Sequence, residues 1–302
     1  MRPCLRTGER LRMCVASGNA RAAGMSSWTT VAGAMAQAKA AGVDRLDAQL
    51  LLVHLLAQPR TWLLAHDDAP LDPTQHDAFS ALLARRADGE PVASLVGEQA
   101  IHGLALRVDA NVLVPRPDTE VLVDRAIELL AGTTGARVVD LGTGSGAIAL
   151  AVKQACPHAA VLATDISAAA LAVAGANARR LGLDVALQPS AWWGGLAGQR
   201  FDLVLSNPPY IASDDPHLAA LRHEPMLALT SGGDGLAALR EIVAGAPAHM
   251  APGAWLLLEH GWDQADAVQA LLRTHGFVQI GTRRDLGGHP RCTGARRRPG
   301  TA

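Results

Sequence analysis

The chain has 302 residues, of which 49% are hydrophobic and 18% charged, and its formal net charge is −1. The apolar content suffices for a real core, while the even charge balance gives no support for a basic, phosphate-binding face, so no direct nucleic-acid partner is expected. No apolar run reaches membrane-spanning length, so no membrane partner is expected. The four cysteines and eleven histidines show neither disulfide nor metal-site spacing, which predicts a cytoplasmic protein without a metal.

The first part of the chain predicts a short extension followed by helices. Residues 1–24 hold five arginines against one acidic residue and contain no apolar stretch, so we expect a disordered extension, or a start codon assigned upstream of Met25, rather than a signal peptide. Residues 25–89 space their apolar residues three and four apart and contain helix-ending glycines, which predicts a small helical domain. This domain holds no catalytic constellation, so it is either a packing bundle or a docking module for a protein substrate.

A linker and a second domain follow. Residues 90–115 are expected to form a linker with short extended segments. From 116 to 297, strand-length apolar runs alternate with helical segments, which favours an α/β sheet with parallel strands. The last strand is predicted at 277–285. The arginine-rich end at 291–302 is expected to be solvated and frayed, and 298–302 are set outside the domain as a tail.

A glycine-rich loop follows the first strand of the second domain. The sequence RVVDLGTGSGAIAL (137–150) places Gly142, Gly144 and Gly146 between an apolar run and a helical one. Glycines at alternate positions let a ligand approach the backbone closely, and in such sheets ligands bind at the carboxyl ends of the strands. The next predicted strand ends at Asp165, whose carboxylate is placed to accept both hydroxyls of a ribose.

The single tyrosine of the chain lies in Asn207-Pro208-Pro209-Tyr210, directly after the apolar run 201–206. Two prolines fix φ and force the preceding residue out of the helical region, so the corner is stiff and extended. Such a corner suits a planar NH2 group, because Asn207 and the Pro208 carbonyl can accept its two hydrogens while Tyr210 packs against its plane. Without a second motif, a proline-rich turn would be the better interpretation.

The glycine loop supplies the second motif. It differs from the dinucleotide-binding pattern because its third glycine comes one residue earlier and Asp140 precedes the loop by two positions. In this it resembles the S-adenosylmethionine loop of Rossmann-like methyltransferases. Each motif alone is weak evidence, but the loop, Asp165 and the corner in this order are strong evidence together.

Further segments narrow the resemblance to one family. They are, in order, VLVPRPDTEVLVDRAIELL (112–130), DLGTGSGAIAL (140–150), SNPPYI (206–211), HEP (223–225) and LLLEHGW (256–262). Together they resemble the bacterial protein-glutamine methyltransferases that modify peptide-chain release factors, over nearly the whole chain. The resemblance implies a Rossmann-like methyltransferase domain with a seven-stranded, mostly parallel sheet, one strand of which is antiparallel, preceded by a helical domain that docks the substrate. The implied reaction moves a methyl group from S-adenosylmethionine to the side-chain amide nitrogen of the glutamine in the Gly-Gly-Gln loop of release factors.

The resemblance also implies roles for single residues. Asn207 matches a residue that touches both the cofactor and the substrate, and Trp192 matches a tryptophan that lines the adenine pocket. The substrate amide is matched to Pro208, Pro209 and Tyr210, and catalysis is assigned to Asn207, Pro208 and Tyr210. The other cofactor positions are Gly142, Thr143, Gly144, Ser145, Gly146 and Asp165.

One departure and several alternatives remain. Ala191 stands where the family often has an acidic residue, so cofactor affinity is expected to be weaker or supported otherwise. An amino methyltransferase acting on adenine in DNA or RNA uses a similar corner to hold a flipped base, but the missing basic face speaks against it. A glutamine methyltransferase for a ribosomal protein carries a different sequence after the Pro-Arg of PRPDTE (115–120). An inactive scaffold that binds release factors is the last alternative.

Overall fold

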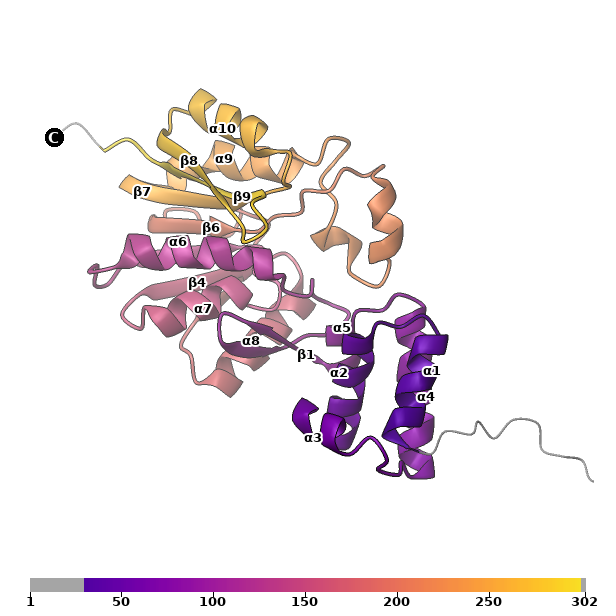
Figure 1. Cartoon of the computed structure of the whole chain (residues 1–302). Coiled ribbons are helices and arrows are strands. Elements are labelled where there is room, and N and C mark those ends of the chain that lie inside the picture. The colour runs from indigo at the N-terminus through magenta and orange to yellow at the C-terminus, as the bar shows by residue number, and fades with distance from the viewer. Residues whose placement is uncertain (1–29, 300–302) are drawn as a thin grey trace, which may run out of the picture.

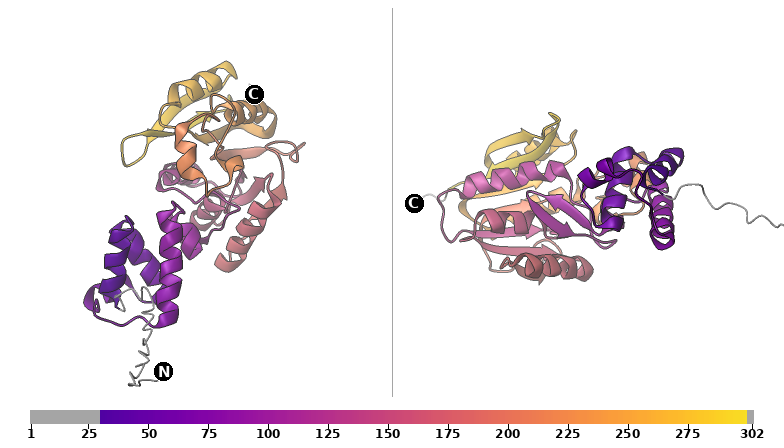
Figure 2. Two further views of the ribbon diagram at one scale, coloured as in Figure 1. Left: turned by 90° about the vertical axis from the view of Figure 1, so that its right-hand side faces the viewer. Right: turned by 60° about the horizontal axis from the view of Figure 1, so that its bottom comes forward.

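The computed structural model describes residues 30–299, which form a small helical part and a larger α/β part (Figures 1 and 2). The predicted extension at 1–24 and the last three residues of the predicted tail lie outside the described residues. Between residues 30 and 299, no helix combines the length and the apolar character that crossing a bilayer requires.

The helical part has a core of its own. Phe79, Leu51 and Leu52 are fully buried at its centre, as the leucine spacing of the sequence indicates. The fourth helix begins with a capping box, in which Asp72 and Gln75 each accept a backbone N–H from the other residue. The helices are α1 (Val31–Ala40), α2 (Arg45–Leu56), α3 (Arg60–Ala65), α4 (Pro73–Ala87) and α5 (Val92–Val96).

The segment between the two parts is ordered by contacts with the α/β part. After α5 it forms an antiparallel hairpin of β1 (Glu98–Ile101) and β2 (Leu104–Arg107). Asn177, fully buried on α8 (Ala168–Leu181), accepts the Arg107 N–H at 2.8 Å and donates to the Arg107 carbonyl at 3.0 Å. The same amide donates to the Ser145 carbonyl at 2.9 Å, so one side chain joins this segment to the glycine loop.

A seven-stranded sheet forms the centre of the α/β part, in the order β5-β4-β3-β6-β7-β9-β8. Every pairing is parallel except those of β9, which runs against both of its neighbours, so the predicted mostly parallel sheet with one antiparallel strand is confirmed. The strands are β3 (Arg137–Leu141), β4 (Ala160–Asp165), β5 (Ala186–Pro189), β6 (Phe201–Ser206), β7 (Met250–Glu259), β8 (Val278–Arg284) and β9 (Pro290–Arg296).

Helices cover both faces of this sheet, which is why its central strands are mostly apolar. Successive residues of a strand point to opposite faces, so Val138 packs in one core with α6 and α7, and Val139 packs in the other with α9 and α10. In Figure 1, α6 crosses the near face of the sheet, while α9 and α10 lie behind β7 and β8. The helices are α6 (Glu120–Leu130), α7 (Ala147–Ala155), α9 (Ala237–His249) and α10 (Ala265–Thr274).

The expectation of a frayed end from residue 291 onward was wrong. Residues 290–296 form β9, which lies between β7 and β8, and Cys292 and Thr293 in it are buried. Its basic character misled the prediction, because the arginines lie at the strand's end, where they donate to backbone carbonyls: Arg296 to Gly253 at 2.9 Å and Arg297 to Met250. The predicted strand at 277–285 corresponds to β8 and is an edge strand.

Candidate active site

A pocket of about 370 Å³ opens at the carboxyl ends of the central strands. Leu141, the last residue of β3, pairs with Thr164 on one side and with Ser206 on the other. The next residues of the chain after these three, Gly142, Asp165 and Asn207, therefore lie side by side, with their backbones separated by the spacing of adjacent strands, about 5 Å. The topological switch point of the sheet lies between β3 and β6: β4 and β5 follow β3 on one side, and β6 and β7 continue on the other. Ligands bind at this point in such sheets.

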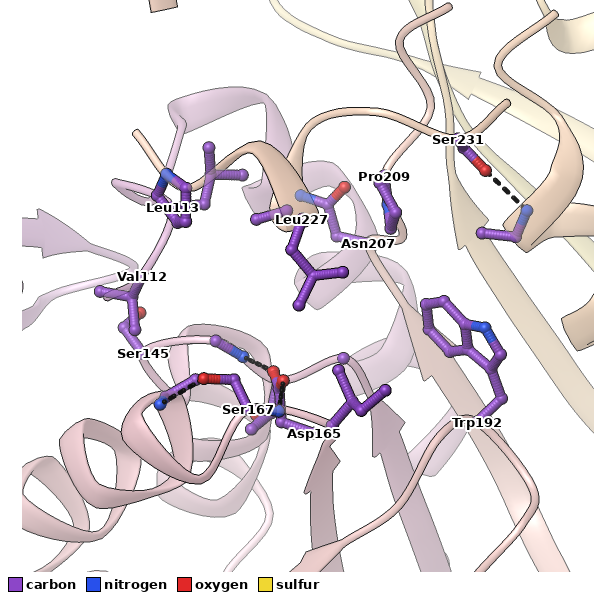
Figure 3. Close-up of a pocket in the computed structure, with 18 of the residues that line it drawn as sticks. Val112, Leu113, Ser145, Asp165, Ser167, Trp192, Asn207, Pro209, Leu227 and Ser231 are labelled. Carbon is purple, nitrogen blue, oxygen red and sulfur yellow. Dashed lines mark hydrogen bonds between the residues drawn. The ribbon is translucent and has the colours of Figure 1, made fainter. Parts of the chain in front are cut away.

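The structure brings most of the sequence-predicted residues to this pocket. In Figure 3, Asn207 and Pro209 lie on one side, Asp165 and Ser167 on the opposite side, and Trp192 at one end. The predicted residues that line it are Gly142, Thr143, Gly144, Ser145, Asp165, Trp192, Asn207 and Pro209.

Three predicted residues do not line the pocket wall. Gly146 is the N-cap of α7, with a φ of 87°. Pro208 is buried in the corner, and Tyr210 packs against the core shared with α9 and α10. Burial is also the main cause that raises the pKa of the Tyr210 hydroxyl, so this ring is neutral at all physiological pH values.

Asp165 is held in place by the backbone at both of its oxygens. Its Oδ2 accepts the Gly144 N–H at 2.9 Å, and its Oδ1 accepts the Ser167 N–H at 2.9 Å. The first bond fixes the glycine loop against β4, and the second begins the turn into α8. Each carboxylate oxygen has two lone pairs, so the side chain keeps acceptor capacity toward the pocket that it lines.

Trp192 explains why the first loop position is glycine. A Cβ on Gly142 would lie 3.3 Å from the Trp192 ring, and Gly142 has a φ of +73°, a value that other residues rarely adopt. Trp193 instead has a structural role, because its indole donates to the Ile242 carbonyl at 3.0 Å and stacks on His249. Only one of the paired tryptophans therefore faces the pocket.

Substitution of Gly142 by alanine is expected to weaken binding of S-adenosylmethionine, the cofactor that the sequence resemblance implies, about tenfold, because the added methyl group displaces the Trp192 ring. Isothermal titration with the cofactor measures this loss. Gly135→Ala is the matched control: its φ is +70°, but nothing lies within 4 Å of an added Cβ. It should lose about 1 kcal/mol of stability from the same backbone strain and bind the cofactor normally. Wild-type affinity in Gly142→Ala would show that the ring does not contact the ligand.

Asp140 organises the glycine loop from below. It is fully buried, and its Oδ2 accepts the Thr143 hydroxyl at 2.6 Å. Burial raises the pKa of this carboxyl to about 7, an effect that the Thr143 bond opposes and the charge of Asp165 adds to. Its other oxygen has no hydrogen-bond partner among the described residues. The Asp140 carboxylate therefore stabilises the glycine loop and is not part of the pocket wall.

The Asn207 corner is fixed from two sides. The Tyr210 carbonyl accepts from the Gln264 amide at 2.9 Å, and a Cβ on Gly235 would lie only 2.3 Å from that carbonyl. On the other side, the Asn207 amide nitrogen lies 3.4 Å from the Thr119 hydroxyl, which is almost completely buried. Close packing against Gly235 and Thr119 thus sets where Asn207 stands.

Sequence reasoning missed Thr119, although it lies in the segment PRPDTE that carried the resemblance. The segment PRPDTE is held in place by residues 211–233, which follow the Asn207 corner. There, the buried Glu224 accepts the Val114 N–H at 3.1 Å and pairs with the Arg116 guanidinium. Thr119 ends the short 3-10 helix η1 (Pro117–Thr119) that follows. The other pocket-lining residues not predicted include Asn111, Val112, Leu113, Pro115, Ile166, Ser190, Leu227, Thr230, Ser231 and Glu241.

His260 has a structural role next to the site. Its Nδ1 lies 2.8 Å from the Gly261 carbonyl, and its Nε2 lies 2.8 Å from the Thr293 hydroxyl. Since Nδ1 faces an acceptor, it carries the proton, and Nε2 accepts from the threonine. Burial lowers the pKa of the ring, which keeps it neutral. Within residues 30–299, no three histidine, cysteine or acidic side chains gather as metal ligands would.

The sheet order and the pocket at its carboxyl edge define a Rossmann-like methyltransferase. Residues 119–234 match the family model described as the Methyltransferase small domain, and residues 30–97 match the PrmC N-terminal domain. A solved 16S rRNA methyltransferase of T. thermophilus superposes with a TM-score of 0.51 at 20% identity, covering 67% of this chain and 50% of that one. This last likeness concerns the fold alone.

Curated relatives settle the family. The release factor glutamine methyltransferase of Bordetella pertussis is 51% identical over 84% of this chain and 95% of its own length. The enzyme of the same name from Xylella fastidiosa is 51% identical over 83% of this chain and 92% of its own length. The chain belongs to the family of release factor glutamine methyltransferases.

Proposed function

We propose that the chain transfers a methyl group from S-adenosylmethionine to the side-chain amide nitrogen of the glutamine in the Gly-Gly-Gln loop of peptide-chain release factors. The observation that carries the proposal is the pairing of β3 with β6, which sets the glycine loop and the Asn207 corner side by side in a chain of this family. A cofactor loop and an amide-gripping corner must be adjacent for transfer, because the donor and acceptor atoms react only in contact.

The residues present fit this cofactor. The Asp165 carboxylate retains acceptor capacity for the two ribose hydroxyls, and Gly144 has nothing within 4 Å of an added Cβ, so a ligand can approach its backbone. Trp192 offers a flat apolar face for adenine. Asn111, Ser190 and Glu241 add polar groups to a mostly apolar wall that also includes Ala191. When bound, the cofactor supplies an electrophilic methyl group on a sulfonium.

The corner's task is to make an amide nitrogen nucleophilic. An amide nitrogen is a poor nucleophile because its lone pair is delocalised. Asn207 Oδ1 and the Pro208 carbonyl accept its two hydrogens, which favours a pyramidal nitrogen with a free lone pair and so stabilises the transition state more than the ground state. With S-adenosylmethionine bound, Asn207 and the Pro208 carbonyl would hold the nitrogen against the methyl group, for which the cofactor would supply a neutral thioether as the leaving group, and the surplus proton of the nitrogen would pass to solvent. Tyr210 keeps this region dry by packing beneath the corner.

We infer that the helical domain predicted at 25–89, of which the structure describes residues from 30 onward, docks the release factor. At its carboxyl end, Asp88 pairs with Arg222 at 2.7 Å and with His223 at 3.3 Å. Both partners belong to the segment 211–233, which also contributes Leu227 to the pocket. In Figure 2 this orange segment lies between the helical part and the sheet. A partner held by the helices is thereby placed beside the pocket.

Incubation of the full chain with radiolabelled S-adenosylmethionine and a release factor tests the activity. The acceptors are the native factor and a variant whose loop glutamine is replaced by alanine. Label on the native factor alone is expected. Label on DNA or rRNA fragments instead would move the activity to an adenine amino group, and cofactor binding without transfer to any acceptor would support a scaffold.

A further inference from the structure

Glu259 is a buried carboxylate at the edge of the pocket for which the chemistry above has no use. It ends β7 and is 1% exposed, and its Oε2 has no hydrogen-bond partner among the described residues. Moving a carboxylate out of water costs several kcal/mol unless its lone pairs are satisfied. A buried acid with one unsatisfied oxygen therefore calls for a functional explanation.

The sheet places this acid directly beside Asn207. Leu258 of β7 pairs with Ser206 of β6, so the next residues along the two strands, Glu259 and Asn207, stand opposite each other. Both Asn207 and Thr119 lie near enough to lower the pKa of this carboxyl, against the burial that raises it. Glu259 itself does not line the pocket, whereas Asn207 and Thr119 do.

An ionised acid in this place selects one orientation of the Asn207 amide. An asparagine side chain has a donor arm, Nδ2, and an acceptor arm, Oδ1. A carboxylate accepts hydrogen bonds but cannot donate them, so it attracts Nδ2 and repels Oδ1. With Nδ2 directed at Glu259 and at the Thr119 hydroxyl, Oδ1 is left for a hydrogen of the substrate amide.

We propose that Glu259 is a positioning residue for methyl transfer: its carboxylate fixes the Asn207 side chain with Oδ1 toward the substrate nitrogen. This rests on the proposed function. Glu259 acts through Asn207 and does not touch the reacting atoms. It therefore governs how well the corner prepares the nitrogen, and it leaves cofactor binding alone.

The charges around Glu259 set the pH range in which this works. Burial raises the pKa of Glu259 to about 7, against the opposing effects of Thr119, the positive charge of Arg291 and Asn207, while Asp118 raises it further. The other titratable groups that interact with it are Tyr210 and Cys292, whose own pKa values are raised and which stay neutral. The acid is thus ionised above about pH 7 and loses its charge below that value, so kcat should fall as the pH is lowered through 7.

Glu259→Gln in the full chain tests the proposal, because it keeps the shape and removes the charge. We expect kcat with a release factor to fall about 10- to 100-fold, while the Kd for S-adenosylmethionine and the KM for the release factor stay within about threefold of wild type. The fall of kcat below pH 7 should also be weaker in the variant than in wild type. Glu128→Gln is the matched control: it changes a half-exposed carboxylate on α6 that pairs with Arg283, and kcat should not change.

Unchanged kcat in a folded Glu259→Gln would overturn the proposal. A loss of kcat matched by a lower melting temperature, with the wild-type pH profile retained, would also overturn it, since that is what a purely structural role produces. If the variant does not fold, Thr119→Val removes the other partner of Nδ2 and should lower kcat about threefold or more at unchanged cofactor Kd; an unchanged kcat there refutes the idea. No methylation by the wild-type chain would refute the proposed function instead.

Discussion

Replacement of Asn207 by alanine is expected to lower kcat for glutamine methylation about 100- to 1,000-fold, the loss typical for removal of one group that stabilises a transition state. The Kd for S-adenosylmethionine should change by less than about threefold, because the Asp165 carboxylate and the glycine loop remain in place. The reason is positional: Asn207 follows Ser206, which pairs with the last residue of the glycine-loop strand. Single-turnover kinetics with labelled cofactor, beside calorimetric titration, separate the two effects.

Gln99→Ala is the control for this experiment. Gln99 carries the same amide on the β1–β2 hairpin, where its Nε2 donates to the neighbouring Ala100 carbonyl outside the pocket. It should leave both kcat and Kd unchanged. An equal loss of turnover and cofactor affinity in Asn207→Ala would reject the role of amide orienter and leave Asn207 as a cofactor ligand only.

Substitution of Asp165 should produce the opposite pattern. In Asp165→Ala the Kd for S-adenosylmethionine is expected to rise about 100-fold, since a carboxylate hydrogen bond contributes about 1.5–3 kcal/mol and tenfold in affinity corresponds to about 1.4 kcal/mol. At saturating cofactor, kcat should stay within about threefold of wild type. Asp165→Asn keeps the shape and one acceptor, so it should lose less, about 10-fold.

Asp202→Asn is the matched control for Asp165. Asp202 also accepts a backbone N–H, that of Arg137 at 2.8 Å, but it stands near the amino end of β6, away from the pocket. It should bind the cofactor as wild type does. A fall of kcat at saturating cofactor, with Kd unchanged in Asp165→Asn, would contradict a ribose-binding role and point to a loop that no longer aligns the substrate.

Features that depend on residues close together in the chain could be predicted from the sequence, and features that depend on distant residues could not. The helical part, the glycine loop and the stiff corner were predictable, because helical spacing, positive-φ glycines and paired prolines act within a few residues of the chain. The strand β9 was not, because its arginines look solvated until Gly253 and Met250 are known to offer carbonyls near the amino end of the neighbouring strand β7. Basic residues at a strand end carry no local signal of such partners.

The same limit applies to the site. The segment LLLEHGW contributes to the family resemblance, but nothing in its sequence marks Glu259 as a site residue. Only the pairing of β6 with β7 shows that Glu259 faces Asn207, while His260 points to Thr293 on β9. An acidic residue inside an apolar run can be recognised in the sequence, and its burial is expected to cost desolvation free energy. The sequence does not show which side chain the acid interacts with.

The sequence by itself determined the fold class and the family and predicted the residues for a cofactor and an amide, since these depend on motifs along the chain. The tertiary structure decided which of them meet. It set Gly142, Asp165 and Asn207 at the carboxyl ends of three adjacent strands, placed Thr119 in the pocket lining and Glu259 beside Asn207, and left Pro208 and Tyr210 out of the pocket lining. The physical reason is that strand order results from a competition among pairings between distant segments, so it cannot be predicted from the residues next to one another in the chain.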